Sequence, residues 1–153
     1  MREINTIFIH CTATPEGRDY TPAQVEGWFT ALGWPVPGYH YVIHLDGSIQ
    51  QMLGVNLVAW GVKKHNQNSI HIAYVGGVTA GHRPKDTRTD EQKVAMVRLI
   101  DKLRADYASG QWGNTPCSLR EATVRLQLRG HREVAPKACP CFDVEELRKE
   151  LLI

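Results

Sequence analysis

Residues 131–143 read HREVAPKACPCFD, a segment with two prolines that brings an imidazole, an ammonium and two thiols into one short loop. Few loops with a purely structural role need all three groups. Imidazole nitrogen and thiolate sulfur are the side-chain donors that Zn²⁺ prefers, and a catalytic zinc site uses three protein ligands and keeps a fourth position for water. His131 and a cysteine of this loop are therefore candidate ligands, and a third ligand must come from elsewhere in the chain.

The candidate for the distant ligand is His10. It closes the apolar run Ile7-Phe8-Ile9 and precedes residues 11–15, CTATP, which are loop-like in composition. A histidine at the end of a buried strand lies at the rim of a sheet, where binding sites are commonly built. Taken alone, such a histidine is more often a core residue bonded to the backbone than a ligand. The pattern thus gives the location of a site and leaves its metal open.

The composition indicates one soluble globular domain over residues 1–153. Apolar residues make up 42% of the chain, and no segment approaches the ~20 consecutive apolar residues of a membrane span. Lys and Arg total 18 against 16 for Asp and Glu, and the resulting net charge of +2 is scattered along the chain. We therefore expect no nucleic-acid partner and no membrane association, and we expect a monomer.

The amino terminus and the cysteines indicate the compartment. The first residues, MREIN, contain no apolar core of a signal peptide, so we expect synthesis in the cytoplasm. The four cysteines, at positions 11, 117, 139 and 141, do not form two convincing pairs. A reducing compartment would keep their thiolates available for a metal.

Capping and turn signals locate the first half of the secondary structure. Thr21, Pro22 and Gln24 have the pattern of a capped helix start, and Gly33 can end that helix. Residues 39–44 alternate as a strand, Asp46-Gly47 signals a hairpin, and residues 48–52 form the predicted return strand.

The second half of the sequence predicts a buried strand over 68–75, a helix over 90–107 and a loop over 108–116. A further strand is predicted over 124–129, which points Leu126 and Leu128 inward and leads to His131. A last helix begins at Asp143, with a capping box completed by Glu146. Strands interleaved with helices predict an α/β fold with a central mixed sheet flanked by about three helices.

A zinc ion held by His10, His131 and Cys139 would suit amide hydrolysis, because zinc lowers the pKa of its bound water toward ~7 and polarises a carbonyl. Lys137 could then place a positive charge near the developing oxyanion, a role typically worth ~3 kcal/mol. Tyr39 could donate or relay a proton. Cys141 stays open as an alternative ligand, because alternation along an extended loop points residues 139 and 141 the same way.

Three segments carry a family resemblance. They are GYHYVI at residues 38–43, NSI at 68–70 and the stretch from Gly130 to Asp143, within which VAPKACP at 134–140 is the most specific. In this order, over nearly the whole chain, they resemble the zinc N-acetylmuramoyl-L-alanine amidases typified by the amidase lysozymes of T-odd phages. Peptidoglycan recognition proteins share that fold. The resemblance implies peptidoglycan as partner, cleavage between N-acetylmuramic acid and the L-alanine of the stem peptide, and action on the wall after release or export.

The resemblance also implies the roles of single residues. It implies that His10, His131 and Cys139 hold Zn²⁺ while Tyr39 and Lys137 assist catalysis. Trp60 falls where the family tends to place an aromatic residue of the groove wall, although a buried packing role is an equal alternative. Of the other histidines, all first expected to be structural or solvated, His40 has the best claim to a supporting or substrate-binding role. The family more often has serine at position 141 and glycine at position 71.

Three other functions remain possible at this point. A cysteine hydrolase would use Cys139 or Cys11 as nucleophile, with His131 or His10 as base. A non-catalytic peptidoglycan-binding module would keep the groove without a working metal site. A structural zinc site would need a fourth protein ligand, for which Cys141 is the candidate.

Overall fold

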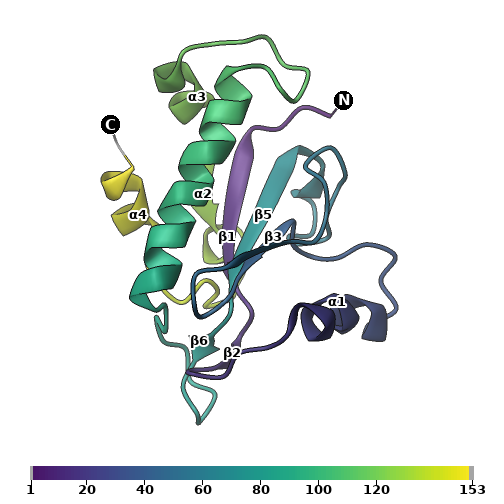
Figure 1. Ribbon diagram of the computed structural model, residues 1–153, viewed down its shortest axis with the longest axis vertical. Helices are drawn as coiled ribbons and strands as arrows, with labels where there is room; N and C mark the ends of the chain where they lie inside the picture. Colours follow the sequence, from purple (N-terminus) through teal and green to yellow (C-terminus); the bar gives the residue numbers. More distant parts are fainter. Residues whose placement is uncertain (1, 152–153) are drawn as a thin grey trace.

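The computed structural model describes residues 2–151, which fold around a five-stranded sheet with the order β4-β3-β5-β1-β7 (Figure 1). Strands β1 (Thr6–Cys11), β5 (Ser69–Tyr74), β7 (Gln127–Gly130) and β3 (Tyr41–Ile43) run parallel to one another. The hairpin strand β4 (Ile49–Gln51) is antiparallel to β3, so the sheet is mixed, as predicted. Two short strands, β2 (Thr14–Pro15) and β6 (Gly77–Val78), pair separately.

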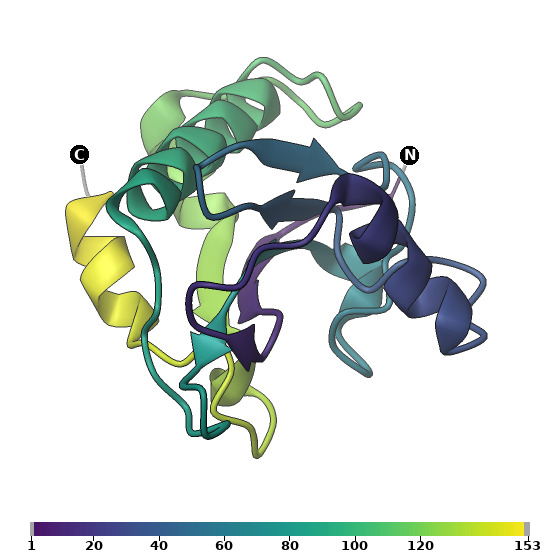
Figure 2. The same ribbon diagram turned by 60° about the horizontal axis from the view of Figure 1, so that its bottom comes forward.

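Helices cover both faces of the sheet (Figures 1 and 2). Helices α2 (Asp90–Ala108) and α4 (Val144–Glu150) lie on one side, and α1 (Pro22–Ala31) lies on the other. Helix α3 (Leu119–Arg125) packs beside α2, and the 3₁₀ turns η1 (Asn66–Asn68) and η2 (His131–Glu133) precede β5 and follow β7. No helix among these residues has the length and apolar character needed to cross a bilayer.

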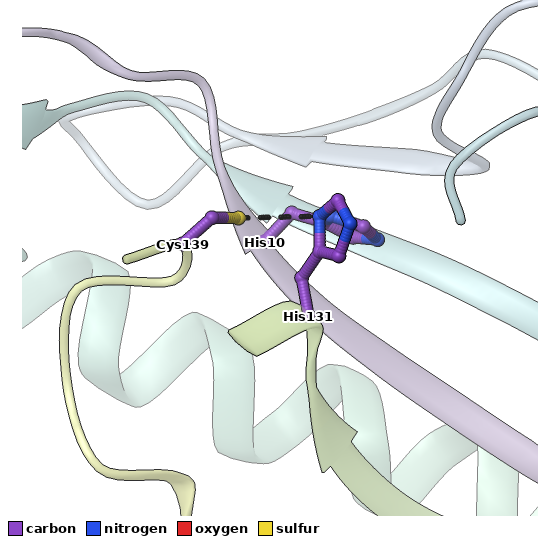
Figure 3. A group of neighbouring side chains, drawn as sticks. All are labelled: His10, His131 and Cys139. Atoms are coloured by element: carbon purple, nitrogen blue, oxygen red, sulfur yellow. Dashed lines mark hydrogen bonds between the residues drawn. The ribbon is translucent and has the colours of Figure 1, made fainter. Parts of the chain in front are cut away.

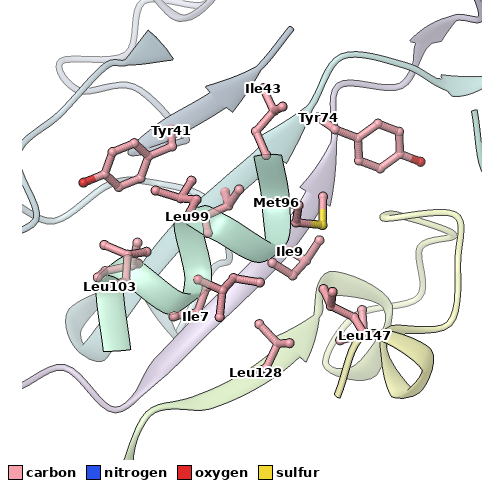
Figure 4. Packing of buried hydrophobic residues seen from close by; sticks show 14 of the residues in the cluster. Ile7, Ile9, Tyr41, Ile43, Tyr74, Met96, Leu99, Leu103, Leu128 and Leu147 are labelled. Atoms are coloured by element: carbon pink, nitrogen blue, oxygen red, sulfur yellow. The ribbon is translucent and has the colours of Figure 1, made fainter. Parts of the chain in front are cut away.

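Alternation along the central strand β1 separates the main core from the site. Ile7 and Ile9 point toward α2 and α4 and join the main apolar cluster, which includes Met96 and Leu147 (Figure 4). Each such fully buried side chain contributes about 1.5–3 kcal/mol relative to an exposed one. His10, between Ile9 and Cys11, points to the opposite face. The large core therefore fixes β1, and β1 presents His10 on the side that α2 and α4 leave uncovered.

Two local predictions are corrected by the structure. The strand expected over 124–129 is shorter, because α3 runs to Arg125 and raises the number of α-helices to four. The Ser118 hydroxyl caps α3, and Glu121 completes the capping box. At α4, the Asp143 side chain accepts from the backbone N–H of Glu145, and the box expected with Glu146 does not form. Leu126 and Leu128 are buried as predicted.

Candidate metal centre and substrate groove

Three side chains from distant parts of the chain form a group that could hold a metal ion. One ligand atom from each of His10, His131 and Cys139 lies within 4.8 Å of the other two (Figure 3). His10 stands near the end of β1, and His131 directly follows β7. Because β1 and β7 are parallel neighbours paired through Ile9 and Gly130, their carboxyl ends bring the two imidazoles together.

Backbone hydrogen bonds place the third member of the group. The N–H of Arg132 donates to the Cys139 carbonyl at 2.8 Å, which fixes the loop beside the 3₁₀ turn η2. The N–H of Cys11 donates to the Cys139 sulfur at 3.3 Å, and that sulfur lies 3.7 Å from His10 Nδ1. These three residues can therefore hold a metal ion, and no fourth protein ligand joins them among residues 2–151.

The surroundings shift the pKa values of all three side chains toward the forms that bind a metal. Burial, followed by the charges of His71, His131 and Lys137, holds the pKa of His10 well below its ordinary value. Burial and then Lys137 lower the pKa of His131. Hydrogen bonding from the Cys11 thiol is the largest cause that lowers the pKa of Cys139. Neutral imidazoles and a thiolate are the ligand forms that bind metal.

Cys141 does not belong to the group. Its backbone has a φ of +66°, so the chain is not extended there and the alternation assumed for this loop fails. Its sulfur lies 3.7 Å from the Cys11 sulfur, and burial raises its pKa to about 12. The geometry thus groups Cys139, and not Cys141, with the two histidines.

Tyr39 borders the group of candidate ligands. Its ring centroid lies 5.2 Å from that of His10, and its hydroxyl donates to the Cys11 carbonyl at 3.4 Å. Burial, followed by the nearby thiols of Cys139 and Cys11, raises the pKa of the phenol. Tyr39 therefore stays a protonated hydrogen-bond donor next to the site at neutral pH.

A groove of about 680 Å³ opens beside His131. Residues 134–137 line it together with His131. Trp34 and Trp60, whose ring centroids are 5.9 Å apart, stand in the same groove, and 45% of Trp60 is exposed. Trp60 is thus not a packed core residue. Lys63 and Lys64 also line the groove and add positive charge to it.

His40 does not line the groove. The residue has no exposed surface, its Nε2 lies 2.8 Å from the Leu57 carbonyl, and its Nδ1 accepts from the backbone N–H of His71 at 3.0 Å. Burial lowers its pKa to about 4, so the ring is neutral. The structure therefore gives His40 a supporting place in the interior and does not agree with the predicted substrate contact.

Sequence reasoning missed the part that His71 takes in the site. His71 lies on β5, and its Nδ1 is 2.9 Å from Nε2 of His10. Burial holds its pKa well below the ordinary value, so this ring is neutral too. The only sequence signal was the departure from the glycine that the family more often has at this position.

Comparisons with known proteins agree with this geometry. Residues 1–142 match the family model described as N-acetylmuramoyl-L-alanine amidase. The endolysin of Escherichia phage T7 is 32% identical over 92% of this chain and 83% of its own length. The endolysin of Klebsiella phage KP32 is 31% identical over 94% of this chain and 85% of its own length.

Solved structures share the fold at lower identity. The Ph2119 endolysin from the Thermus scotoductus MAT2119 bacteriophage superposes with a TM-score of 0.71 at 24% identity, covering 99% of this chain and 86% of that one. Drosophila PGRP-LB gives a TM-score of 0.65 at 22% identity, covering 92% and 76%. With a family model that spans all three grouped side chains and their groove, the chain belongs to the N-acetylmuramoyl-L-alanine amidase family and is a cell-wall amidase.

Proposed function

We propose that this amidase is a zinc enzyme, in which His10, His131 and Cys139 hold Zn²⁺ and the groove beside His131 receives the muramoyl-peptide part of peptidoglycan. The observation that carries the proposal is the convergence of the three ligand atoms within 4.8 Å, with one of the three residues, His131, lining that groove. The bond cleaved is the amide between N-acetylmuramic acid and L-alanine. The enzyme would reach the wall after release or export.

The donor set fits zinc. Bonds of ~2.1 Å to nitrogen and ~2.3 Å to sulfur at a tetrahedral angle place the two atoms about 3.6 Å apart. The separation between His10 Nδ1 and the Cys139 sulfur is 3.7 Å. Two imidazoles, one thiolate and no fourth side chain among the described residues correspond to a catalytic zinc site, which keeps one position for water. The lack of a fourth side chain among the described residues argues against a structural zinc site, which would need four protein ligands.

Bound zinc would supply an activated water and polarise the scissile carbonyl. The protein's own residues would stabilise the developing charge and donate a hydrogen bond or a proton. Lys137 lines the groove together with His131, whose pKa its charge lowers, and it would place its ammonium where negative charge develops on the carbonyl oxygen. Tyr39, protonated and adjacent to His10, would donate a hydrogen bond or a proton on the other side.

Digestion of purified peptidoglycan tests the proposal. We expect new L-alanine amino termini without new reducing ends, loss of this turnover on treatment with a chelator, and recovery on addition of Zn²⁺. Undiminished turnover by the metal-free protein would refute the zinc enzyme. The 3.7 Å contact between Cys139 and His10 would then favour a cysteine hydrolase, and metal analysis separates the two because alkylation of Cys139 stops both. Saturable wall binding without new amino termini would instead indicate a binding module.

Trp60 is proposed to bind substrate through its exposed face. Trp60→Ala is expected to raise KM about tenfold with kcat nearly unchanged, because truncating an aromatic anchor typically costs over 1 kcal/mol of binding. Leu57→Ala is the matched control, since Leu57 is 56% exposed and does not line the groove. Steady-state kinetics on soluble muropeptides give both constants. An unchanged KM in the Trp60 variant would remove it from the binding surface.

A further inference from the structure

His71 lies directly behind the candidate ligand His10. The two rings are buried, with exposures of 0% and 1%, and His71 Nδ1 is 2.9 Å from His10 Nε2. The other ring nitrogen of His10, Nδ1, faces Cys139. His10 therefore has one nitrogen directed to the metal position and the other directed to His71.

The neighbours of His71 hold its ring in one place. The ring stacks on Phe8 with centroids 5.6 Å apart and an interplanar angle of 9°, and on His40 at 5.9 Å and 3°. Its backbone N–H donates to His40 Nδ1. Gly61 lies on a third side of the His71 ring, and the Cβ of any other residue at position 61 would collide with that ring. His71 and Gly61 are thus fitted to each other, and the ring nitrogen facing His10 cannot turn away without disturbing this stack.

The direction of the hydrogen bond follows from the chemistry of a ligating histidine. A neutral imidazole whose Nδ1 lone pair binds a metal carries its proton on Nε2. His10 then donates from Nε2, His71 accepts at Nδ1, and the proton of neutral His71 lies on its Nε2. That Nε2 has no partner among residues 2–151. A buried donor without a partner is costly, and an apolar side chain of similar size would avoid the cost.

We propose that His71 is a positioning residue, which accepts the Nε2–H of His10 and so holds Nδ1 of His10 toward the metal. The inference rests on the proposed zinc site and adds a residue that the family resemblance does not imply, since glycine is more common at this position. Partners of this kind fix the tautomer and orientation of a ligating histidine, and their loss typically weakens metal binding 10–100-fold.

Two substitutions of similar size separate positioning from packing. His71→Leu removes the acceptor, whereas His71→Asn keeps an acceptor oxygen near the place of Nδ1. Zn²⁺ dissociation constants, measured by competition with a chromophoric chelator, are expected to rise 10–100-fold for the leucine variant and to stay within about threefold of the unmodified protein for the asparagine variant. An unchanged constant in His71→Leu would overturn the inference. Equal weakening in both variants would overturn it too, because it would indicate packing alone.

A second measurement needs no variant and so covers the case in which one fails to fold. In the zinc-loaded protein labelled with ¹⁵N, nitrogen chemical shifts of the imidazoles report which ring nitrogen carries the proton. We expect protonation at Nε2 of His71 and a coupling across the bond to His10. A proton on Nδ1 of His71 would refute the arrangement. Failure of the unmodified protein to bind Zn²⁺ would refute the proposed function as well, whereas tight binding with an unaffected leucine variant refutes only the role of His71.

Discussion

Replacing His131 with alanine is expected to abolish both metal binding and turnover. The substitution leaves only His10 and Cys139 in the group, and two donors do not make the three-ligand site that a catalytic zinc ion requires. Without the metal, the stabilisation of transition-state charge, worth several kcal/mol, is lost. Activity should therefore fall by a factor of about 10³ or more.

The measurement has two parts and a matched control. Metal content after dialysis and the rate of release of amino termini are compared in His131→Ala and in His82→Ala. His82 is an exposed histidine outside the group, so its removal should change neither quantity. Circular dichroism checks that both variants are folded. A His131→Ala protein that keeps one equivalent of zinc at unchanged affinity would contradict the proposed ligand set.

Local signals in the sequence were sufficient to predict much of the fold. The helix start at Thr21 was predicted because a capping box involves residues three apart, and the structure confirms the box with Gln24. The same kind of signal, Ser118 with Glu121, precedes α3 and was overlooked because residues 124–129 also alternate as a strand. Where the two local patterns overlap, at residues 124 and 125, the structure has the capped helix, and the strand begins only at Gln127.

The site was predictable only in part, because its members differ in what places them. His10 lies near the end of β1 and His131 directly follows β7, a placement that the apolar patterns already indicated. The choice of Cys139 and not Cys141 as candidate ligand depends on the positive φ at Cys141, which spacing in the sequence cannot reveal. The position of the His71 ring depends on the register that pairs His71 with Phe8 and on the space left by the missing side chain of Gly61. Contacts of this kind arise from strand pairing, and no single segment encodes them.

Lys137→Ala is expected to lower kcat by about 10²–10³ while zinc stays bound, since loss of one group that stabilises a developing oxyanion typically has that effect. Zinc affinity should change little for two reasons. Lys137 is not the largest cause of any lowered pKa among the ligands, because burial comes first at His10 and His131 and hydrogen bonding from Cys11 comes first at Cys139. Removing its cation also relieves repulsion of the metal, which offsets the small rise in proton competition.

Lys63→Ala is the matched control, because Lys63 lines the same groove but is not among the charges that lower the pKa values of the three candidate ligands. Its loss should affect KM more than kcat, whereas loss of Lys137 should lower kcat and kcat/KM together. Kinetics on a soluble muropeptide, with zinc content measured on the same samples, separate the two lysines. Loss of zinc from Lys137→Ala would show that the lysine maintains the metal site, and the catalytic role would then have to pass to Tyr39, the other donor beside His10.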